Sequence, residues 1–195
     1  KAITADDLRA FVTQRLTRDT LVIGIVGDIT PAKLAELLDA TFGTLPAQGT
    51  DWRLPKIRAN TDGRTIVINK DVPQSAILFA DQGLLRDDPD FYAAYVMNHV
   101  LGGGGFTSRL YGEVREKRGL AYSISSGLNP RRASATTVGG AGTANARVHE
   151  TLDVVKAEWQ RMAENGVTND ELKDAKTYLT GAYPLQFTGS TRIAR

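Results

Sequence analysis

Residues 101–128 read LGGGGFTSRLYGEVREKRGLAYSISSGL, a stretch that combines unusual backbone freedom with closely spaced polar side chains. Four consecutive glycines, Gly102–Gly105, end one helical pattern, and a short basic amphipathic segment follows from Ser108. Gly119 can supply the left-handed residue that ends this segment, after which the sequence alternates like a strand. The stretch therefore predicts a helix, a glycine-rich connection, a second helix and a strand in immediate succession.

Strands and helices flank this stretch in an order typical of an α+β domain. The further predicted strands are 64–70, 75–81 and 133–143, and the further predicted helices run from Asp88-Pro89 to Gly102, from Asn145 to Glu164, and onward from the capping box of Thr168 and Glu171. Strands in hairpin-like pairs that are followed by helices indicate an antiparallel sheet with helices packed on one face, not a doubly wound sheet.

The N-terminal part of the chain reads as a separate helix–strand–helix piece. Its predicted elements are a helix capped by Thr4, a buried apolar strand at 20–27, and a helix from Thr30-Pro31 to Gly43. Residues 47–63 lose all periodicity and hold Trp52 as their one large anchor. We therefore expect an N-terminal piece at 1–46, a linker at 47–63, and a main domain at 64–195 that is truncated at its end.

Composition excludes several classes of function. The 24 basic and 22 acidic residues leave a formal net charge of +2, which gives no electrostatic footprint for nucleic acid. The absence of cysteine removes disulfides, thiolate chemistry and cysteine-held zinc together. No apolar run approaches the roughly 20 residues that a membrane-spanning helix needs.

The two histidines are weak candidates for a metal site. His149 begins a His-Glu-x-x-Asp run in which His149 and Asp153 would share one helix face, as two zinc ligands can. A solvent-facing helix start with acidic residues near its N-terminus explains the same run, and we favour that explanation. His99 lies at a helix end before the glycines and is expected to pack or cap. The sequence therefore predicts no metal ligand in this chain.

Three interpretations of the glycine run are possible. A phosphate cradle would require a strand before the glycines and a correctly placed lysine, and both are missing. A connector that lets two backbones approach closely is more plausible. A mobile loop that contacts an extended ligand through its N–H and C=O groups is the third reading.

Arg115 and Tyr122 stand on either side of the predicted corner at Gly119. A helix–glycine–strand corner can bring a guanidinium and a phenol toward one point, and both groups are hydrogen-bond donors. Such a pair suits a carbonyl oxygen that gains negative charge during attack on a peptide bond. Spacing alone, however, favours a surface arginine in an Arg-Glu-Lys-Arg run beside a half-buried strand tyrosine.

The run from Gly103 to Ser126 strongly resembles the C-terminal, non-metal half of the pitrilysin/insulinase zinc metallopeptidases. In that family, a Ser-Arg-Leu followed by Arg-Glu-x-x-Gly-Leu-x-Tyr marks the second half of the catalytic chamber. The resemblance extends through Val72-Pro73-Gln74-Ser75 and covers 3–46 as the closing piece of a preceding domain. It implies the α+β metallohydrolase fold of the processing-peptidase and LuxS-like kind.

The resemblance also implies roles for particular residues. Arg115 and Tyr122 match the pair that holds the substrate carbonyl and stabilises the tetrahedral intermediate. The glycine-rich segment resembles a loop that handles substrate, which makes six residues candidate peptide contacts: Gly102, Gly103, Gly104, Gly105, Phe106 and Ser108. The His-x-x-Glu-His zinc motif of the other half is absent from this sequence. Zinc is therefore expected in a partner half, with none bound by this chain.

The expected partners are an extended peptide substrate and a zinc-bearing half, in the same protein or as a partner subunit. A homodimer is a further expectation, because 1–46 could complete the main domain as a circular permutation or as a swap between two chains. The alternative function is a structural core subunit without proteolysis. Paired bacterial members of the family are often exported, which favours the periplasm or cell envelope over the cytoplasm.

Overall fold

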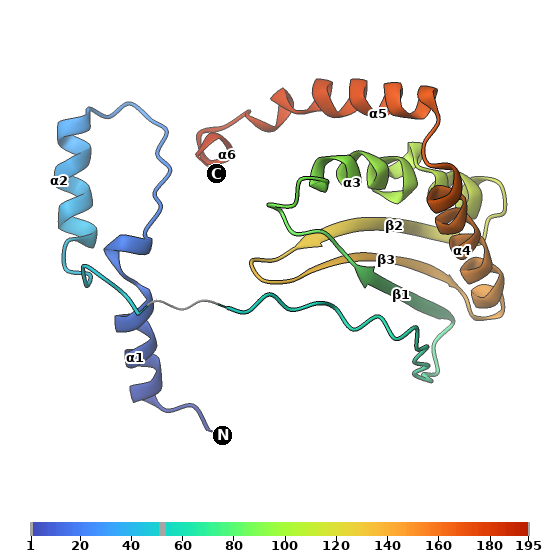
Figure 1. Ribbon diagram of the computed structural model, residues 1–195, viewed down its shortest axis with the longest axis horizontal. Helices are drawn as coiled ribbons and strands as arrows, with labels where there is room; N and C mark the ends of the chain where they lie inside the picture. The colour runs from blue at the N-terminus through green and yellow to red at the C-terminus, as the bar shows by residue number, and fades with distance from the viewer. Residues whose placement is uncertain (1, 51–53, 195) are drawn as a thin grey trace. The chain divides into compact units, whose positions relative to one another are not determined.

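The computed structural model describes residues 2–50 and 54–194 of the chain (Figure 1). The chain divides into two compact units. The larger unit comprises Pro55–Gly181, and the smaller unit comprises Lys1–Leu54 together with Ala182–Arg195. The predicted corner at Gly119 lies in the larger unit, so that unit holds the candidate site.

The larger unit is built on an antiparallel three-stranded sheet. Its strands are β1 (Gln74–Gln82), β2 (Ala121–Pro130) and β3 (Ala135–Ala144), in the order β1-β3-β2. Ile77 of β1 and Ile124 of β2 both pair with Ala141 of β3, which places these three side chains on one face. Three of the predicted strands are confirmed, and the α+β fold with an antiparallel sheet is confirmed with them.

Helical segments cover one face of this sheet (Figure 1). They are α3 (Phe91–Asn98), η2 (His99–Gly103), η3 (Gly105–Thr107), η4 (Tyr111–Glu116), η5 (Asn145–Arg147), α4 (Val148–Asn165) and α5 (Asn169–Ala182). η2 and η4 are π-helical turns, η2 continuing α3. Thr168 and Glu171 form the predicted capping box before α5.

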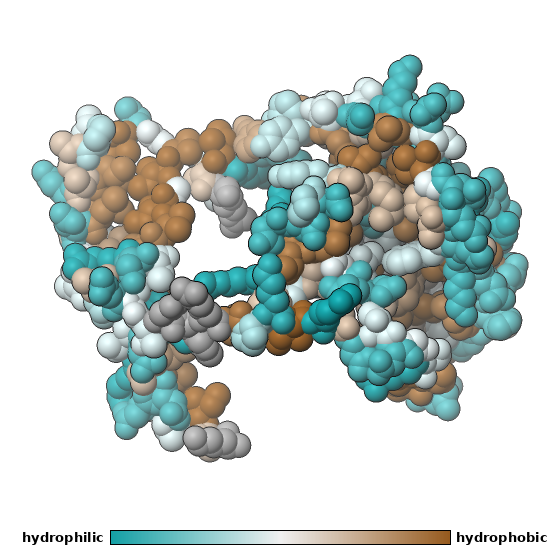
Figure 2. All heavy atoms as spheres, viewed as in Figure 1, coloured by the Kyte–Doolittle hydropathy of each residue, from teal (hydrophilic) through white to brown (hydrophobic). Residues whose placement is uncertain are grey.

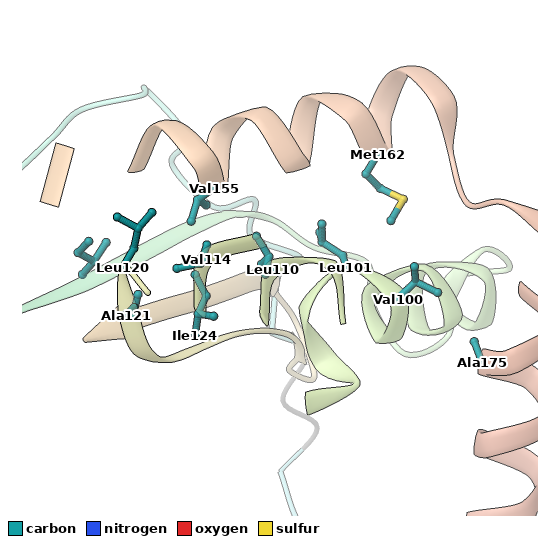
Figure 3. Packing of buried hydrophobic residues seen from close by; sticks show 12 residues of the cluster. Val100, Leu101, Leu110, Val114, Leu120, Ala121, Ile124, Val155, Met162 and Ala175 are labelled. Atoms are coloured by element: carbon teal, nitrogen blue, oxygen red, sulfur yellow. The ribbon is translucent and has the colours of Figure 1, made fainter. Parts of the chain in front are cut away.

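The hydrophobic core fills the space between the sheet and these helices (Figure 3). The helical segment 109–118, which contains η4, is called the short helix below. Its Leu110 and Val114 are fully buried in this core together with Ile124 of β2, and Val155 of α4 closes the layer above them. The other buried hydrophobic members of this core are Ile77, Val100, Leu101, Leu120, Ala121, Ala141, Met162 and Ala175. The short helix is therefore held on the sheet by burial of apolar area, the main stabilising term in folding.

Gly139 of the central strand permits a second contact between sheet and helices. The ring of Phe79 occupies the space that a side chain at Gly139 would need. From there it meets the Trp159 ring of α4 edge to face, with ring centroids 5.8 Å apart. α4 is thus anchored over β1 through two aromatic side chains.

The opposite face of the sheet carries the side chain of Leu78 of β1, which is 88% exposed. Its partner on β3, Gly140, has no side chain. Tyr122 of β2 is also largely exposed, at 78%. A register shift between Ala121 and Ser123 makes Tyr122 a bulge residue, the kind of irregularity that re-aims a side chain.

The smaller unit contains helices with no buried residues. They are α1 (Ala5–Arg15), η1 (Arg18–Thr20), α2 (Pro31–Phe42), η6 (Pro184–Gln186) and α6 (Ser190–Ile193). The predicted caps are present, since Thr4 accepts from Asp7 N–H and Thr30 accepts from Lys33 N–H. Helix ends are therefore encoded locally, whereas the apolar faces of α1 and α2 find no core within this unit.

Two predicted strands are wrong. Residues 21–26 lie outside any helix or strand, and Val22 is 95% exposed. The apolar side chains of this segment form part of the brown surface beside α2 in Figure 2. Residues 64–70 are likewise irregular, with Ile66, Val67 and Ile68 about three-quarters exposed. A β pattern forms a strand only when another strand completes its hydrogen bonds, and neither segment has one among the described residues.

The predicted anchor Trp52 lies outside the described residues. Within residues 2–50 and 54–194, no helix combines the length and the apolar character that crossing a bilayer requires.

Candidate functional site

The glycine run fixes the start of the short helix on the sheet. Gly102 is buried, and an added methyl there would lie 2.5 Å from Ser126 Oγ and 2.8 Å from the Ser126 backbone nitrogen. Nearby, the Asn98 and Ser126 side chains bond each other at 2.8 Å in the interior. Gly102 therefore serves as a packing residue, in agreement with the connector reading of the glycine run.

The corner at Gly119 fixes the other end of the short helix. Gly119 adopts φ +57°, the left-handed conformation that the sequence predicts, and its N–H donates to Arg115 O at 2.9 Å. Arg147, just before α4, donates to the carbonyls of Gly119 and Arg118 at 3.2 and 3.4 Å. Thr143 of β3 donates to Leu120 O at 2.6 Å. These bonds satisfy carbonyls that a helix end leaves open.

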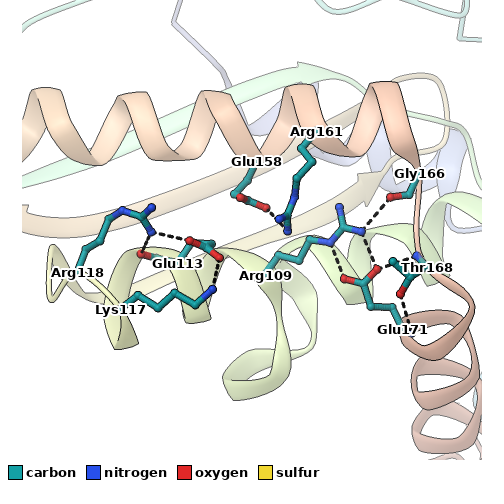
Figure 4. A network of polar contacts seen from close by, with 9 residues as sticks. All are labelled: Arg109, Glu113, Lys117, Arg118, Glu158, Arg161, Gly166, Thr168 and Glu171. Atoms are coloured by element: carbon teal, nitrogen blue, oxygen red, sulfur yellow. Dashed lines mark hydrogen bonds and ion pairs between the residues drawn. The ribbon is translucent and has the colours of Figure 1, made fainter.

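Ion pairs engage most cations of the short helix (Figure 4). Arg109 donates twice to the Glu171 carboxylate, each bond 2.6 Å, and once to Gly166 O at 2.9 Å. Lys117 and Arg118 both pair with Glu113, at 2.6 and 2.5 Å. These cations therefore already have carboxylate partners within the helix or across the α4–α5 turn.

Arg115 differs from these neighbours. Its guanidinium carbon lies 4.4 Å from the centre of the Tyr122 ring and 4.9 Å from that of Tyr111. No described residue accepts a hydrogen bond from the Arg115 side chain or forms an ion pair with it. The Tyr122 hydroxyl also has no hydrogen-bond partner among the described residues. The structure thus brings the two predicted residues together with their donor groups unused.

The six predicted peptide contacts divide into exposed and buried positions. Gly103, Gly105 and Phe106 are exposed, and Gly104 is partly exposed. Gly102 and Ser108 are buried; the Ser108 hydroxyl donates to Gly105 O at 2.8 Å. A peptide could therefore reach the first group directly, whereas contact with the buried pair would require this turn to open.

The two histidines do not fit a zinc site. His149 is almost fully exposed, and its Nε2 lies 3.4 Å from Asp153 Oδ2. The His99 ring stacks on Tyr178 with centroids 5.2 Å apart, and partial burial lowers its pKa. Across the described part of the chain, no three side chains of His, Cys, Asp or Glu gather as a metal site would require. The residues present therefore do not fit zinc.

Comparison with known proteins assigns the family. The model of the peptidase M16 inactive domain matches residues 2–179. The chain belongs to the peptidase M16 family. This confirms the resemblance to the half of these zinc proteases that lacks the metal site, and the match covers the helix–Gly119–strand corner of the M16 chain.

Curated relatives and solved structures agree with this family. The M16 chain is 33% identical over 187 residues to an uncharacterized zinc protease of Streptomyces coelicolor. This match covers 93% of this chain and 40% of that protein. It is also 30% identical over 185 residues to a Helicobacter pylori protein named a non-peptidase homolog; the match covers 94% of this chain and 42% of that protein. The crystal structure of a peptidase M16 inactive domain from Pseudomonas fluorescens superposes on this chain with a TM-score of 0.84 at 30% identity. The superposition covers 98% of this chain and 45% of that chain. The M16 chain thus spans less than half the length of these relatives.

Sequence reasoning missed three residues that support the candidate site. Tyr111 is buried beneath Arg115, Arg147 caps the Gly119 corner, and Glu171 binds Arg109. The four-residue spacing of Tyr111 and Arg115 could have indicated their contact, because such residues share a helix face. The other two contacts join segments far apart in sequence, so no local pattern could have revealed them.

The Arg109–Glu171 pair predicts how stability depends on pH. The Arg109 hydrogen bonds lower the pKa of Glu171 from 4.5 to about 2. A carboxyl whose pKa is lower in the folded state stabilises the fold above its unfolded pKa, and that stabilisation is lost as the pH falls from 4.5 toward 2. Over this window we expect the free energy of unfolding of Glu171→Gln to decline less than that of the parent chain.

The measurement is urea denaturation at several pH values across the window. The matched control is Glu116→Gln, which removes an exposed carboxylate from the short helix that carries Arg109 and should keep the parent's profile. Equal pH profiles for Glu171→Gln and the parent chain would show that this ion pair does not govern acid stability.

Proposed function

We propose that this M16 chain is the substrate-binding, non-zinc half of a pitrilysin-type zinc metalloendopeptidase. Arg115 and Tyr122 stabilise the tetrahedral intermediate of peptide hydrolysis, while the zinc site comes from another domain or subunit. We expect the chain to be inactive alone, since no three His, Cys, Asp or Glu side chains among the described residues gather as a metal site requires. Its substrate is an extended peptide.

One observation carries this proposal: among the described residues Arg115 has no acceptor, although its helix is rich in bound cations. Arg109, Lys117 and Arg118 are each bonded to a carboxylate. A purely structural arginine at position 115 would be expected to find a similar partner. Instead it lies beside Tyr122, whose side chain is largely exposed. A cation and a phenol with unused donors form a site for an oxygen that becomes negative.

The chemistry of the pair follows from its donors. A guanidinium offers five N–H groups and keeps its charge, and a phenol adds one O–H group. When a nucleophile adds to a peptide carbonyl, negative charge grows on the carbonyl oxygen. Charge-assisted hydrogen bonds to that oxygen strengthen as the charge grows, so they stabilise the transition state more than the bound substrate. The zinc half, when bound, supplies the activated water.

Fixed geometry should make the two donors effective. The short helix is anchored at Gly102 and Arg109 at one end and at Gly119 at the other. Donors held in place need little reorganisation at the moment of reaction, which is where much of the catalytic effect of such sites arises. We place Gly105 and Phe106 at the substrate side, because they are exposed beside this helix.

The test is reconstitution with a zinc-bearing M16 half that carries the His-x-x-Glu-His motif. A fluorogenic, unstructured peptide serves as substrate for the chain alone, for the zinc half alone, and for the mixture. We expect hydrolysis only in the mixture, and we expect a chelator to abolish it. Cleavage by the zinc half at the same rate with and without this chain would overturn the proposal.

A second candidate is a structural core subunit that takes no part in proteolysis. The observation in its favour is the name of the Helicobacter pylori relative, a non-peptidase homolog. Such a subunit would bind its partner without needing unused donors at positions 115 and 122. Stable association with the zinc half, combined with unchanged hydrolysis, would favour this second candidate.

We further propose that 1–46 is the closing piece of a preceding domain in a longer protein, with 47–63 as the linker. The exposed apolar residues of 21–26 and the coreless helices of the smaller unit support this view. A homodimer formed by a swap is the alternative, and light scattering after gel filtration distinguishes it from a monomer. For the compartment, we favour the bacterial periplasm or cell envelope.

A further inference from the structure

Four side chains form a continuous row of contacts from the glycine turn to the strand. The rings of Phe106 and Tyr111 meet edge to face, with centroids 4.9 Å apart and planes at 90°. The guanidinium of Arg115 lies over Tyr111 at 4.9 Å and over Tyr122 at 4.4 Å. Tyr111 is 8% exposed whereas Phe106 is 74% exposed. Tyr122, at the other end, is 78% exposed, so the row has a buried centre and two exposed ends.

The backbone explains why these side chains meet. Gly105 adopts φ +59°, a conformation that a residue with a side chain rarely takes, and it turns the chain between two helical segments. Ser108 closes this turn by donating to Gly105 O. Tyr111 and Arg115 are four residues apart and lie on one face of the short helix. The glycine turn thus presents Phe106 to Tyr111, and the helix presents Tyr111 to Arg115.

We propose that Tyr111, braced by Phe106, is a positioning residue that holds the guanidinium of Arg115 beside Tyr122. This inference rests on the proposed function of Arg115. It gives the glycine turn a role in the site beyond any contact with the peptide, since the turn acts on Arg115 through two rings. Phe106 then supports the site through its contact with the Tyr111 ring.

The physical argument is one of restricted freedom. An arginine side chain is long and samples many rotamers unless contacts select one. The described residues provide Arg115 with no ion pair and no side-chain hydrogen bond, so the two rings are the contacts that select its orientation. The attraction of a cation to a ring face is electrostatic and strengthens when water is excluded. Tyr111 is the buried ring, so it should contribute most to holding the guanidinium.

A spectroscopic test on the full 195-residue chain does not depend on activity. The Nε–Hε signal of Arg115 is assigned by its loss in Arg115→Lys, and the ring currents of the two tyrosines should displace it from the other arginine signals. We expect Tyr111→Phe to keep this displacement because a ring remains, and Tyr111→Leu to reduce it. An unchanged signal in Tyr111→Leu would overturn the inference.

A second variant covers the case in which Tyr111→Leu fails to fold. Phe106→Leu changes an exposed side chain, so its fold should persist, as far-ultraviolet circular dichroism can verify. Loss of the edge-to-face brace should broaden or move the Arg115 signal. If the signal stays while the KM of the assembled peptidase rises, Phe106 contacts the peptide directly and the inference is wrong.

Kinetics separate this inference from the proposed function. In the assembled peptidase we expect Tyr111→Leu to lower kcat about tenfold, equivalent to about 1.4 kcal/mol, with KM within twofold. Tyr111→Phe should restore kcat to within twofold of the parent value. If Arg115→Ala leaves turnover intact, the proposed function fails even where the spectrum supports positioning. If Arg115→Ala is inactive but Tyr111→Leu is fully active, positioning alone fails.

Discussion

Replacing Arg115 with alanine should lower the kcat of the assembled peptidase by about 10²- to 10³-fold, with little change in KM. This is the loss that follows removal of one donor from a preorganised oxyanion site. The expected pattern separates transition-state stabilisation from binding, because an interaction that strengthens as charge develops affects kcat more than KM. Single-turnover measurements with a quenched fluorescent peptide would provide both values.

The matched control is Arg118→Ala on the same short helix. Arg118 is paired with Glu113, so its removal alters the local charge equally without touching the proposed site. We expect turnover within twofold of the parent value. Tyr122→Phe removes a single neutral donor and keeps the ring against Arg115, so its expected loss is smaller, about tenfold. Equal losses for Arg115→Ala and Arg118→Ala would show that only overall charge matters.

A methyl group at Gly102 should destabilise the larger unit by about 2 kcal/mol. The added carbon would lie 2.8 Å from the backbone nitrogen of Ser126 and 2.8 Å from a methyl carbon of Leu110. A backbone atom of β2 cannot move aside as the end of a flexible side chain can, so strain must spread through the strand or the helix. In a chain of this size, such a loss corresponds to a fall in Tm of roughly 5 °C.

Gly112→Ala is the control for this prediction, and its expected effect on stability has the opposite sign. Gly112 lies in the short helix, and an added methyl there meets no atom within 4 Å. It should therefore stabilise the chain by about 0.5–1 kcal/mol, chiefly because alanine restricts the unfolded chain. Thermal unfolding of both variants measures the difference. If Gly102→Ala melts with the parent chain, the glycine run is not a packing device.

Local sequence patterns were sufficient to predict helix caps and turns, because these features depend on residues close together in the chain. The helix caps at Thr4, Thr30 and Thr168 each depend on bonds within three residues, and all three were predicted from sequence. The turn at Gly119 was predicted for the same reason, since only its own φ had to be judged. The strands that became β1, β2 and β3 also carried clear alternation or small-residue runs.

The two wrong strands show where local patterns fail. Residues 20–27 and 64–70 have apolar, β-branched sequences, but a strand is a property of a pair and neither segment has a partner among the described residues. The same limit applies to the site. Sequence placed Arg115 and Tyr122 near one corner, and the spacing of Tyr111 and Arg115 could have indicated their contact. The bulge at Tyr122 in β2, however, is not predicted by any local pattern.

The close approach of Phe79 to Gly139 has a consequence for how this domain can diverge. The ring needs the space of a missing side chain, and through Trp159 it anchors α4 over the sheet. A relative could gain a side chain at the position of Gly139 only if the position of Phe79 became smaller. The two positions therefore should change together in evolution, one in each of two neighbouring strands, and a compensating change on α4 should follow them.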